Sequence, residues 1–382
     1  MMRFRVAAFA TALCLAAPAI AAPPAYPSAI HHVFVIVLEN EDYNTIFGPD
    51  TPSPYLGHEL PQQGALFTNY YATGHASLGN YTAMISAQPE APMLQADCDK
   101  YIDFAPGTLD AHGVATGNGC VYPPSVKTVA DQLEQKGFTW HGYMEDMGND
   151  ALREASTCAH PVPGGDGVLR ATPTDSYAYR HNPFIYFHSI IDRQAACDAN
   201  DVRLDKLTDD LADPSKTPNL SFIVPSVCND GHDIPKCADG TPGGLPKADA
   251  WLKVWVPRIL ASPAFKQDGL LIVTFDEAAR DASACCNEPS GPNVKQQGFY
   301  GPGGGRIGAV VLSPFIAPGT LVTDPVNHYG LTRSIEDIFG LPHLALAGDA
   351  NLGTLRPAYL RAFKSGKNAA SSPISGRNAH KR

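Results

Sequence analysis

Short apolar runs recur along the chain, and each has the length of a strand. Val33–Leu38, Ser221–Val224 and Leu270–Phe275 are dense runs, and Arg306–Leu312 has the same character. Uninterrupted apolar runs of this length are typical of strands that helices cover on both faces. Phe138–Tyr143 is a further predicted strand. The pattern therefore predicts a sheet that lies inside the molecule.

Helical spacing of apolar residues appears between the predicted strands. It covers Val126–Lys136, Ala248–Leu260 and Tyr329–Phe339, and the first of these segments is followed by Gly137, a common helix stop. Strands that alternate with helices are typical of α/β proteins, in which the strands are mainly parallel. We therefore expect an α/β fold with a mainly parallel central sheet.

Two long segments interrupt this alternation. Gln88–Pro124 and Ala155–Tyr177 are rich in Pro, Gly, Asp and Cys. Long segments without secondary structure are uncommon in compact domains and are often functional, so we interpret both as insertions that cover a site. The stretch GPGGGRIG, from Gly301, lacks the Lys-Ser/Thr ending of a phosphate loop and precedes a strand, which predicts a flexible loop.

The two ends of the chain differ from its middle. Residues 1–21 contain two Arg, an apolar run and the small-residue site Ala19–Ala21, a pattern that predicts a secretory signal peptide. A membrane anchor is the alternative, but the run is short for a span. Residues 364–382 are basic and polar, which predicts a disordered tail. We expect a secreted or periplasmic protein without a transmembrane anchor, with residues 22–363 as a single domain.

Composition excludes one class of partner. Of the 382 residues, 44% are hydrophobic and 17% charged, which is enough apolar material for a large core. The formal net charge is −10, and it becomes −12 once residues 1–21 and their two Arg are removed. Nucleic-acid binding needs clustered positive charge to neutralise phosphates, so we expect no nucleic-acid partner. The sequence carries no indication of oligomeric state.

The cysteines predict disulfides rather than a zinc site. Eight of the nine lie outside residues 1–21, and an even number in an exported protein is typical of a disulfide framework. No pair has the CxxC spacing of a structural zinc site. Proximity alone favours Cys98–Cys120 and Cys228–Cys237. Cys285 and Cys286 are adjacent, so separate partners or a bridge between them are both open.

Polar clusters follow three of the predicted strands. Glu39 and Asn40 follow the first, Asp276 and Glu277 follow the run that ends at Phe275, and a third cluster follows Val224: Asn229, Asp230, His232 and Asp233. In open α/β sheets, ligands bind at the carboxyl ends of the strands. If the strands are parallel, the three clusters converge on one site.

Converging carboxylates predict a bound cation. Several anions in a partly buried place repel one another strongly, and a divalent metal ion offsets that repulsion. All-oxygen ligands fit Ca²⁺, Mg²⁺ or Mn²⁺ better than Cu²⁺. The alternative is that each acid caps a helix or lies on a solvated turn. We favour the metal because a polar cluster with carboxylates follows each of three predicted strands.

Ser77 is the candidate nucleophile. It precedes the helix-like run Tyr81–Ser86, and the N-terminus of a helix suits a phosphate group. A nearby divalent cation would ease deprotonation of the Ser77 hydroxyl, which could then attack phosphorus. Asn80, one turn further on, could hydrogen-bond a phosphoryl oxygen in the transition state. The alternative role for Ser77 is that of a helix N-cap.

Three histidines are candidates for acid–base chemistry or phosphate contact. His181 lies in YRHNPF and His232 in NDGHD, and either could bind phosphate or protonate the leaving oxygen. His328, in NHYGLTRSIEDIFG, precedes a predicted helix. A structural hydrogen-bonding role is an equal alternative for His328.

Seven motifs resemble, in order, those of the phosphoesterase family. They span Val33 to Leu341: FVIVLENEDYNTIFG, HASLGNY, EQKGFTWHGYMEDM, YRHNPF, NDGHD, TFDE and NHYGLTRSIEDIFG. That family includes secreted acid phosphatases and phospholipases C, and it belongs to the alkaline phosphatase superfamily. The Cys/Ser-x-Pro-x-Arg pattern of sulfatases is absent from the nucleophile motif, which reads S-L-G-N.

The resemblance implies a fold and a set of roles. It implies a three-layer α/β sandwich with a parallel central sheet, and Ser77 as the nucleophile that forms a phospho-enzyme. By matching motif positions, Asn80, His181 and His232 would contact the phosphoryl group, and Asp230 and His328 also belong to the catalytic set. A divalent metal ion would be held by Glu39, Asn40, Ser77, Asp276 and Glu277.

Together these observations predict a secreted, metal-dependent hydrolase of phosphoric esters, most simply a phosphomonoesterase of the acid phosphatase type. Its partner would be a small phosphoester, with phospholipid as a further possibility. A phospholipase C-type phosphodiesterase is the alternative within the enzyme class. A metal-stabilised binding protein without turnover is the non-enzyme alternative, although such a protein would not need Ser77 together with every proposed metal ligand.

Overall fold

The computed structural model describes residues 29–164, 170–172, 174–232, 234, 236–287, 289–298, 300–356 and 358. The predicted signal peptide (1–21), the predicted tail (364–382), Asp233 and part of the second insertion lie outside these residues. Within them, no helix combines the length and hydrophobicity that crossing a membrane requires.

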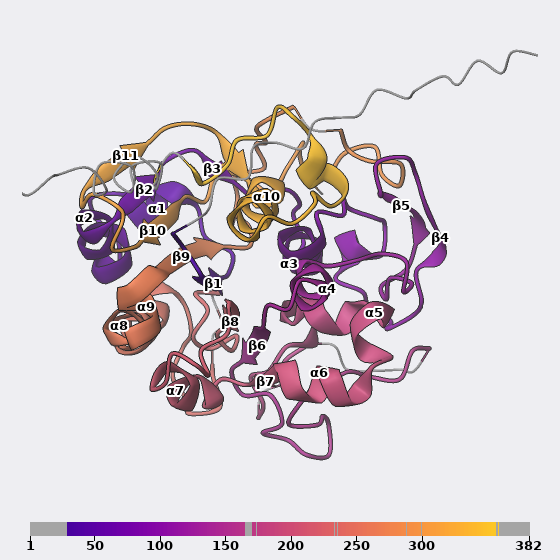
Figure 1. Ribbon diagram of the computed structural model, residues 1–382, viewed down its shortest axis with the longest axis horizontal. Helices are drawn as coiled ribbons and strands as arrows, with labels where there is room; N and C mark the ends of the chain where they lie inside the picture. The colour runs from indigo at the N-terminus through magenta and orange to yellow at the C-terminus, as the bar shows by residue number, and fades with distance from the viewer. Residues whose placement is uncertain are drawn as a thin grey trace, which may run out of the picture.

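The centre of the molecule is an eight-stranded sheet with the strand order β11-β2-β10-β9-β1-β8-β6-β7 (Figure 1). The bounds of its strands are β1 His32–Leu38, β2 Ala65–Phe67, β6 Trp140–Met144, β7 Asp201–Arg203, β8 Leu220–Val224, β9 Gly269–Phe275, β10 Ala309–Leu312 and β11 Thr320–Val322. Two small ladders accompany it: β3 Tyr70–Tyr71 with β12 Val326–Asn327, and β4 Ala105–Leu109 with β5 Ala115–Asn118.

The expected mainly parallel α/β fold is confirmed. β1 lies between β8 and β9 and runs parallel to both, with Val33 opposite Leu220 on one side and Leu270 on the other. β6 is parallel to β7 and β8. In the described part of the sheet, β10 is the strand that runs antiparallel to its neighbours, β9 and β2. The apolar runs of β1, β8 and β9 are buried along nearly their whole length, as their composition predicts.

Helices cover the sheet in two layers. On one side α3 (Ser77–Ser86) packs against α4 (Val129–Gln135) and α10 (His328–Phe339), and on the other α8 (Leu245–Ala261) packs against α9 (Pro263–Asp268), which contacts β1 and β9 (Figure 1). The remaining helices are short: α1 Tyr43–Phe47, α2 Leu60–Gln63, α5 His188–Ile191, α6 Gln194–Asn200 and α7 Lys206–Leu211. Single turns complete the chain: η1 Tyr55–Glu59, η2 Leu94–Ala96, η3 Tyr179–His181, η4 Pro183–Tyr186 and η5 Ala345–Gly348.

Two elements, α4 and β10, begin a few residues later than the sequence pattern predicts, and local interactions explain both differences. α4 begins at Val129 rather than Val126 because Thr128 caps it: the Thr128 side chain accepts from the Asp131 N–H, and the Asp131 carboxylate accepts from the Thr128 N–H. The strand predicted from Arg306 starts at Ala309, after Gly308, whose φ is +76°. A left-handed residue of this kind ends regular pairing and favours glycine.

The glycine-rich loop is packed rather than free. Gly304 and Gly305 donate hydrogen bonds to the carbonyl groups of Ala72 and Ser283 at 3.2 and 2.9 Å. A Cβ atom on Gly304 would lie 1.8 Å from the carbonyl oxygen of Gly74. The expected flexible loop is therefore a close backbone contact with the segment that leads to Ser77, and glycine is needed there because two backbones meet.

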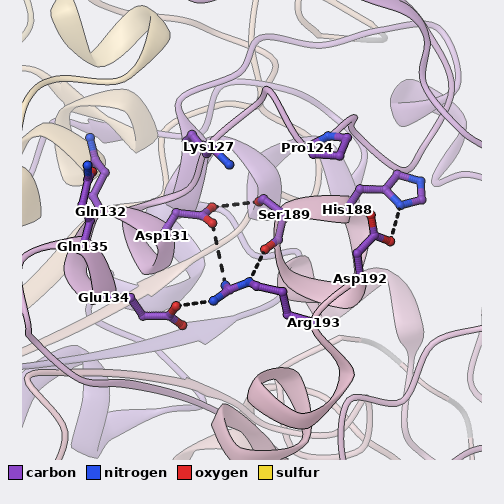
Figure 2. Close-up of a pocket in the computed structure, with 10 residues that line it drawn as sticks. All are labelled: Pro124, Lys127, Asp131, Gln132, Glu134, Gln135, His188, Ser189, Asp192 and Arg193. Atoms are coloured by element: carbon purple, nitrogen blue, oxygen red, sulfur yellow. Dashed lines mark hydrogen bonds and ion pairs between the residues drawn. The ribbon is translucent and has the colours of Figure 1, made fainter.

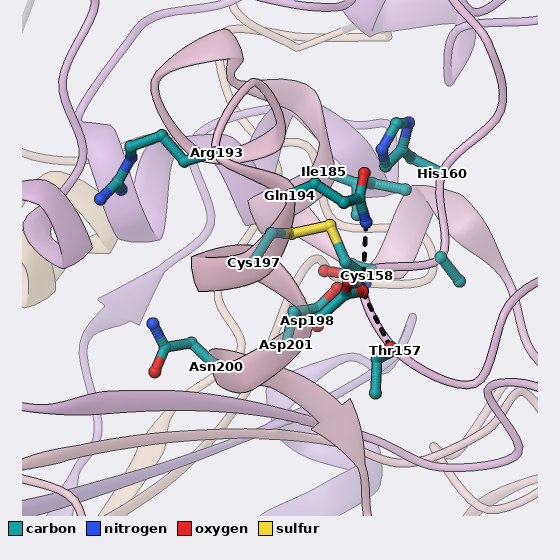
Figure 3. Close-up of a disulfide and its surroundings, with 12 residues drawn as sticks. Thr157, Cys158, His160, Ile185, Arg193, Gln194, Cys197, Asp198, Asn200 and Asp201 are labelled. Atoms are coloured by element: carbon teal, nitrogen blue, oxygen red, sulfur yellow. Dashed lines mark hydrogen bonds between the residues drawn. A yellow bond between two sulfur atoms is a disulfide. The ribbon is translucent and has the colours of Figure 1, made fainter.

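All eight described cysteines form disulfides. The pairs Cys98–Cys120 and Cys228–Cys237 are those that proximity favours, and Cys285 and Cys286 bridge each other. The fourth pair, Cys158–Cys197, ties the second insertion to α6 (Figure 3). Next to it, the Cys158 N–H donates to the Asp201 carbonyl, and the Asp201 carboxylate accepts from the side chain of Asn182 at 2.8 Å. This disulfide therefore supports the segment that carries His181.

Candidate functional site

The polar clusters that follow β1, β8 and β9 meet at one edge of the sheet. The Glu39 N–H donates to the carbonyl of Asp230 and the Asp276 N–H to the carbonyl of Leu38, both at 2.8 Å. The Asn40 N–H donates to Asp276 Oδ1 at 3.0 Å. Parallel pairing explains the convergence, because it brings the carboxyl ends of the three strands to the same level.

Four carboxylates of this edge are buried together. Glu39, Asp230 and Asp276 have no exposed surface, and Glu277 is nearly as buried. Burial is the main cause that raises the pKa of each, and it raises that of Asp276 to about 6. Mutual repulsion adds to the effect, as at Glu39, where Asp276 and Asp230 raise the pKa further. The cluster is therefore short of positive charge.

The unsatisfied oxygens of this cluster fit a cation. Glu39 Oε1, Asp230 Oδ2 and Asp276 Oδ2 are buried and have no hydrogen-bond partner in the described part of the chain. Asn40, whose φ is +59°, donates from Nδ2 to Glu277 Oε1 at 3.1 Å, which leaves its side-chain oxygen as the atom for a metal. Buried oxygens without donors are costly unless a metal ion or a proton meets them. The residues predicted to hold a divalent metal ion are thus assembled in a suitable place.

A second group of possible ligands shares Glu39 with the first. Ligand atoms of Glu39, His181 and Asp230 lie within 4.8 Å of one another. His181 Nε2 is 3.0 Å from Glu39 Oε1 and Nδ1 is 3.6 Å from Asp230 Oδ2, at orientations that make no hydrogen bond. The ring stacks on Tyr81, with centroids 5.3 Å apart. Burial lowers the pKa of His181, and a neutral ring is the form that can ligate a metal or accept a proton.

Ser77 faces the carboxylate cluster rather than capping its helix. It is the first residue of α3, the N-cap position is held by Ala76, and no side chain of the cap residue bonds the helix. The Ser77 hydroxyl donates to Glu39 Oε2 at 3.3 Å. The N-cap alternative is therefore not what the structure shows, and the hydroxyl lies beside the proposed metal ligands.

Asn80, the predicted phosphoryl contact, is hydrogen-bonded to the turn before Ser77. Its Oδ1 accepts from the Thr73 N–H, the Thr73 hydroxyl and the Gly74 N–H. Its Nδ2 lies within hydrogen-bonding distance of the carbonyls of Gly74 and Ala76 and, at 3.3 Å, of Glu277 Oε2. Both amide hydrogens thus have acceptors. As placed, Asn80 holds the turn before Ser77 and ties it to Glu277.

His328 is a structural hydrogen-bonding residue in this arrangement. It is fully buried, its Nε2 lies 2.6 Å from the carbonyl oxygen of Asp276, and the Tyr70 hydroxyl lies 3.1 Å from its Nδ1. Burial lowers the pKa of His328 to about 4, so the ring is neutral. Because both ring nitrogens are engaged, the imidazole fixes the backbone after β9. His232, by contrast, is half-buried, and its N–H donates to Asp230 Oδ1 at 2.9 Å.

Three residues that sequence reasoning did not single out also lie at the site. Arg180 precedes His181, and its guanidinium is 3.6 Å from Asp97 Oδ2. His75 lies in the Ser77 motif, with Nδ1 3.7 Å from Glu277 Oε2, and its ring meets Tyr300 edge to face at 5.4 Å. Position inside two of the seven motifs was the available signal for Arg180 and His75. Asp97 lies in an insertion without any such signal.

An open depression of about 440 Å³ leads to the site. Asn40, His75 and Glu277 line it together with residues of the first insertion and with Arg170 and Tyr300. A larger depression of about 650 Å³ lies between α4 and α5 (Figure 2). Most of its charged side chains are paired with one another, as Arg193 is with Glu134 and His188 with Asp192, and none of its lining residues belongs to the strand-end clusters. We therefore place the candidate site at the first depression.

Comparison with known proteins identifies the family of this chain. The profile of the Phosphoesterase family matches residues 52–342, which is most of the chain. The chain belongs to the Phosphoesterase family. The resemblance that seven short motifs indicated is thereby confirmed.

Curated relatives of this chain include proteins named as acid phosphatases and one named as a phosphatidylinositol-3-phosphatase. A probable acid phosphatase of Kluyveromyces lactis is 28% identical over 85% of this chain and 62% of its own length. An acid phosphatase of Aspergillus fumigatus is 26% identical over 83% of this chain and 56% of its own. The phosphatidylinositol-3-phosphatase of Mycobacterium tuberculosis is 24% identical over 84% and 80%. The chain spans less than two thirds of the two acid phosphatases.

The same fold is found in a crystal structure of a protein in the alkaline phosphatase superfamily from Vibrio parahaemolyticus. The TM-score is 0.51 with 14% sequence identity, over 87% of this chain and 74% of the other. The likeness concerns the fold, and it agrees with the mainly parallel sheet and the helices that cover it.

Proposed function

We propose that this phosphoesterase-family protein is a metal-dependent phosphomonoesterase that acts through a phosphoserine at Ser77. The observation that carries the proposal is the Ser77 hydroxyl, 3.3 Å from Glu39, at the edge of four buried carboxylates, three of which have an unsatisfied oxygen. Acid phosphatases among the relatives support the reaction class.

The chain's own residues account for most of the chemistry. Ser77 Oγ forms a bond to phosphorus while the bond from phosphorus to the alcohol oxygen breaks, and water then cleaves the phosphoserine to release inorganic phosphate. When bound, a divalent cation held by Glu39, Asn40, Asp276 and Glu277 lowers the pKa of the serine hydroxyl and offsets phosphoryl charge. Asn80 keeps the turn before Ser77 in place. His232, half-buried next to Asp230, is our candidate for protonating the alcohol oxygen as it leaves.

An exported protein fits the same proposal. Four disulfides in the described residues are typical of an oxidising compartment, and secretion or periplasmic location follows if residues 1–21 act as a signal peptide. We assign the activity to one domain, residues 22–363. The lipid phosphatase among the relatives extends the candidate substrates to phospholipid monoesters.

The test is hydrolysis of para-nitrophenyl phosphate by the purified protein, with a chelator and with Ca²⁺, Mg²⁺ or Mn²⁺ added back. We expect turnover that the chelator removes and that one of these metals restores. Ser77→Ala should abolish turnover and leave the metal-dependent rise in melting temperature intact. Unchanged turnover in Ser77→Ala would refute the mechanism. Turnover of bis-para-nitrophenyl phosphate or phosphatidylcholine, but not of the monoester, would replace it with the phosphodiesterase alternative.

A further inference from the structure

The Asp97 carboxylate contacts two positively polarised groups of the site, the Leu78 N–H and the Arg180 guanidinium. Its Oδ1 accepts a hydrogen bond from the Leu78 N–H at 3.1 Å, and its Oδ2 lies 3.6 Å from Arg180 Nε. Leu78 directly follows Ser77 in the first turn of α3. Backbone N–H groups at this end of a helix have no partner within the helix and attract anions. An anion of the protein itself therefore occupies the place beside the candidate nucleophile.

Arg180 has binding capacity that Asp97 does not use. Its side chain is only 12% exposed, and its buried Nε–H has no hydrogen-bond acceptor among the described residues. The neighbouring His181 ring is 3% exposed, and its two nitrogens also make no hydrogen bond. A planar guanidinium suits two oxygens of a tetrahedral oxyanion, which a carboxylate 3.6 Å away does not exploit fully. The arrangement points to a ligand with more oxygens than a carboxylate.

Local backbone structure also holds Asp97 in this place. It ends η2 with a φ of +52°, its N–H donates to the Leu94 carbonyl, and the next residue, Cys98, is bonded to Cys120. After burial, the negative charge of Asp97 is a further cause that raises the pKa of Glu277 and of Asp276. Asp97, a fifth anion contributed by the first insertion, would thus worsen the repulsion within the cluster unless Arg180 and the helix end offset it. Its side chain is 20% exposed and lines the open depression, so it can move aside.

We propose that Asp97 takes the place of the substrate's phosphoryl group in the substrate-free protein. Substrate binding displaces the carboxylate, and the Leu78 N–H and the Arg180 guanidinium then bind the phosphoryl oxygens. Arg180 is a catalytic residue in this view, and Asp97 competes with the oxyanion and sets its affinity. The inference rests on the proposed function, because it assigns the phosphoryl-binding groups of that same site.

The test is the affinity of the full-length protein for inorganic phosphate, measured by calorimetry in metal-supplemented buffer. Asp97→Asn keeps the shape of the side chain and removes the competing charge, so we expect phosphate to bind about threefold to tenfold tighter. Arg180→Ala should weaken phosphate binding about tenfold to hundredfold, because a charge-assisted hydrogen bond is lost. Arg180→Lys should recover part of that loss, since it keeps the charge but not the planar fork.

Matched controls lie in the same depression. Asp99 and Arg170 form an exposed ion pair, with side chains 73% and 65% exposed, and both line the depression. Asp99→Asn and Arg170→Ala make the same chemical changes without touching Leu78 or Arg180. We expect both to leave phosphate affinity within about twofold of wild type, because exposed pairs contribute little. Melting temperatures of all variants check that each one folds.

Three results would overturn the inference. Weaker phosphate binding in Asp97→Asn would show that Asp97 only caps α3 and positions Arg180. An equal gain in phosphate affinity in Asp97→Asn and Asp99→Asn would show that the gain comes from the change in net charge and not from the position of Asp97. Unchanged affinity in Arg180→Ala would remove Arg180 from the phosphoryl site. Phosphate binding needs no turnover, so these outcomes are separate from the Ser77→Ala experiment, whose failure would refute the proposed function instead.

Discussion

Removing the metal should make the stability of this protein depend on pH in a direction that the buried carboxylates determine. The pKa of Asp276 is raised from 3.8 to about 6 in the folded chain. Between these values the unfolded chain has released the Asp276 proton and the folded chain still holds it. Unfolding then releases a proton, so the metal-free protein loses stability as pH rises through this window.

The size of this loss of stability follows from the rise in the pKa of Asp276. One pKa unit corresponds to 1.36 kcal/mol, so Asp276 alone accounts for roughly 3 kcal/mol between about pH 4 and pH 6. Glu39, Asp230 and Glu277 are shifted in the same direction and add to it. A bound divalent cation replaces these protons. The stabilisation that the metal provides should therefore grow by at least about 3 kcal/mol from pH 4 to pH 7, which is roughly 4 °C in melting temperature for a domain of this size.

The assay is thermal unfolding followed by circular dichroism, with a chelator or with excess Mg²⁺, Mn²⁺ or Ca²⁺, at half-unit pH steps. The quantity of interest is the difference between the two melting curves at each pH. Asp201 provides a control, because burial raises its pKa to about 7 and it lies by the Cys158–Cys197 disulfide. Asp201→Asn should flatten part of the metal-free curve and leave the metal-dependent difference unchanged. A metal-dependent difference that stays constant with pH would refute the assignment of the cluster to a cation.

Two further substitutions test the placement of neighbouring residues. His328→Ala should lower the free energy of unfolding by roughly 3 kcal/mol, because the Asp276 carbonyl loses its buried donor, whereas His328→Gln, which keeps a donor, should retain most of the stability and an unshifted pH–rate profile. A shifted pH–rate profile in His328→Gln would argue for a proton-transfer role instead. Gly304→Ala should unfold the loop or lower kcat sharply, because the added Cβ would meet the Gly74 carbonyl at 1.8 Å, and wild-type melting together with wild-type kcat would contradict that contact.

Much of the candidate site could be predicted because the direction of the strands brings its residues to one edge of the sheet. Continuous apolar runs followed by acids identify β1, β8 and β9 and the residues at their carboxyl ends. Parallel pairing then places Glu39 and Asp276 at one level, and the turn after β8 brings the Asp230 carbonyl to the Glu39 N–H. Ser77 at the start of a helix is equally local in origin. These features depend on hydrophobic periodicity and chain direction, and both can be determined from the sequence.

The roles of individual side chains depend on partners that are distant in sequence. Asn80 bonds the turn before Ser77 and reaches Glu277, 197 positions away, and His328 bonds the backbone of Asp276. The motif positions of Asn80 and His328 gave no indication of these partners. Asp97 reaches Ser77's helix from an insertion that has no periodicity to interpret. The Cys158–Cys197 pairing is of the same kind.

The sequence by itself thus determined the sheet, its polarity and the meeting of acids at its edge. The tertiary structure alone decided which hydrogen bonds are already satisfied, because a side chain's free capacity depends on every neighbour that the folded chain brings within about 3.5 Å. The hydrogen bonds of Asn80 and His328 hold neighbouring backbone in place. Glu39, Asp276 and Arg180 keep side-chain atoms without a hydrogen-bond partner among the described residues, and the Ser77 hydroxyl lies beside them, so these residues can bind a ligand.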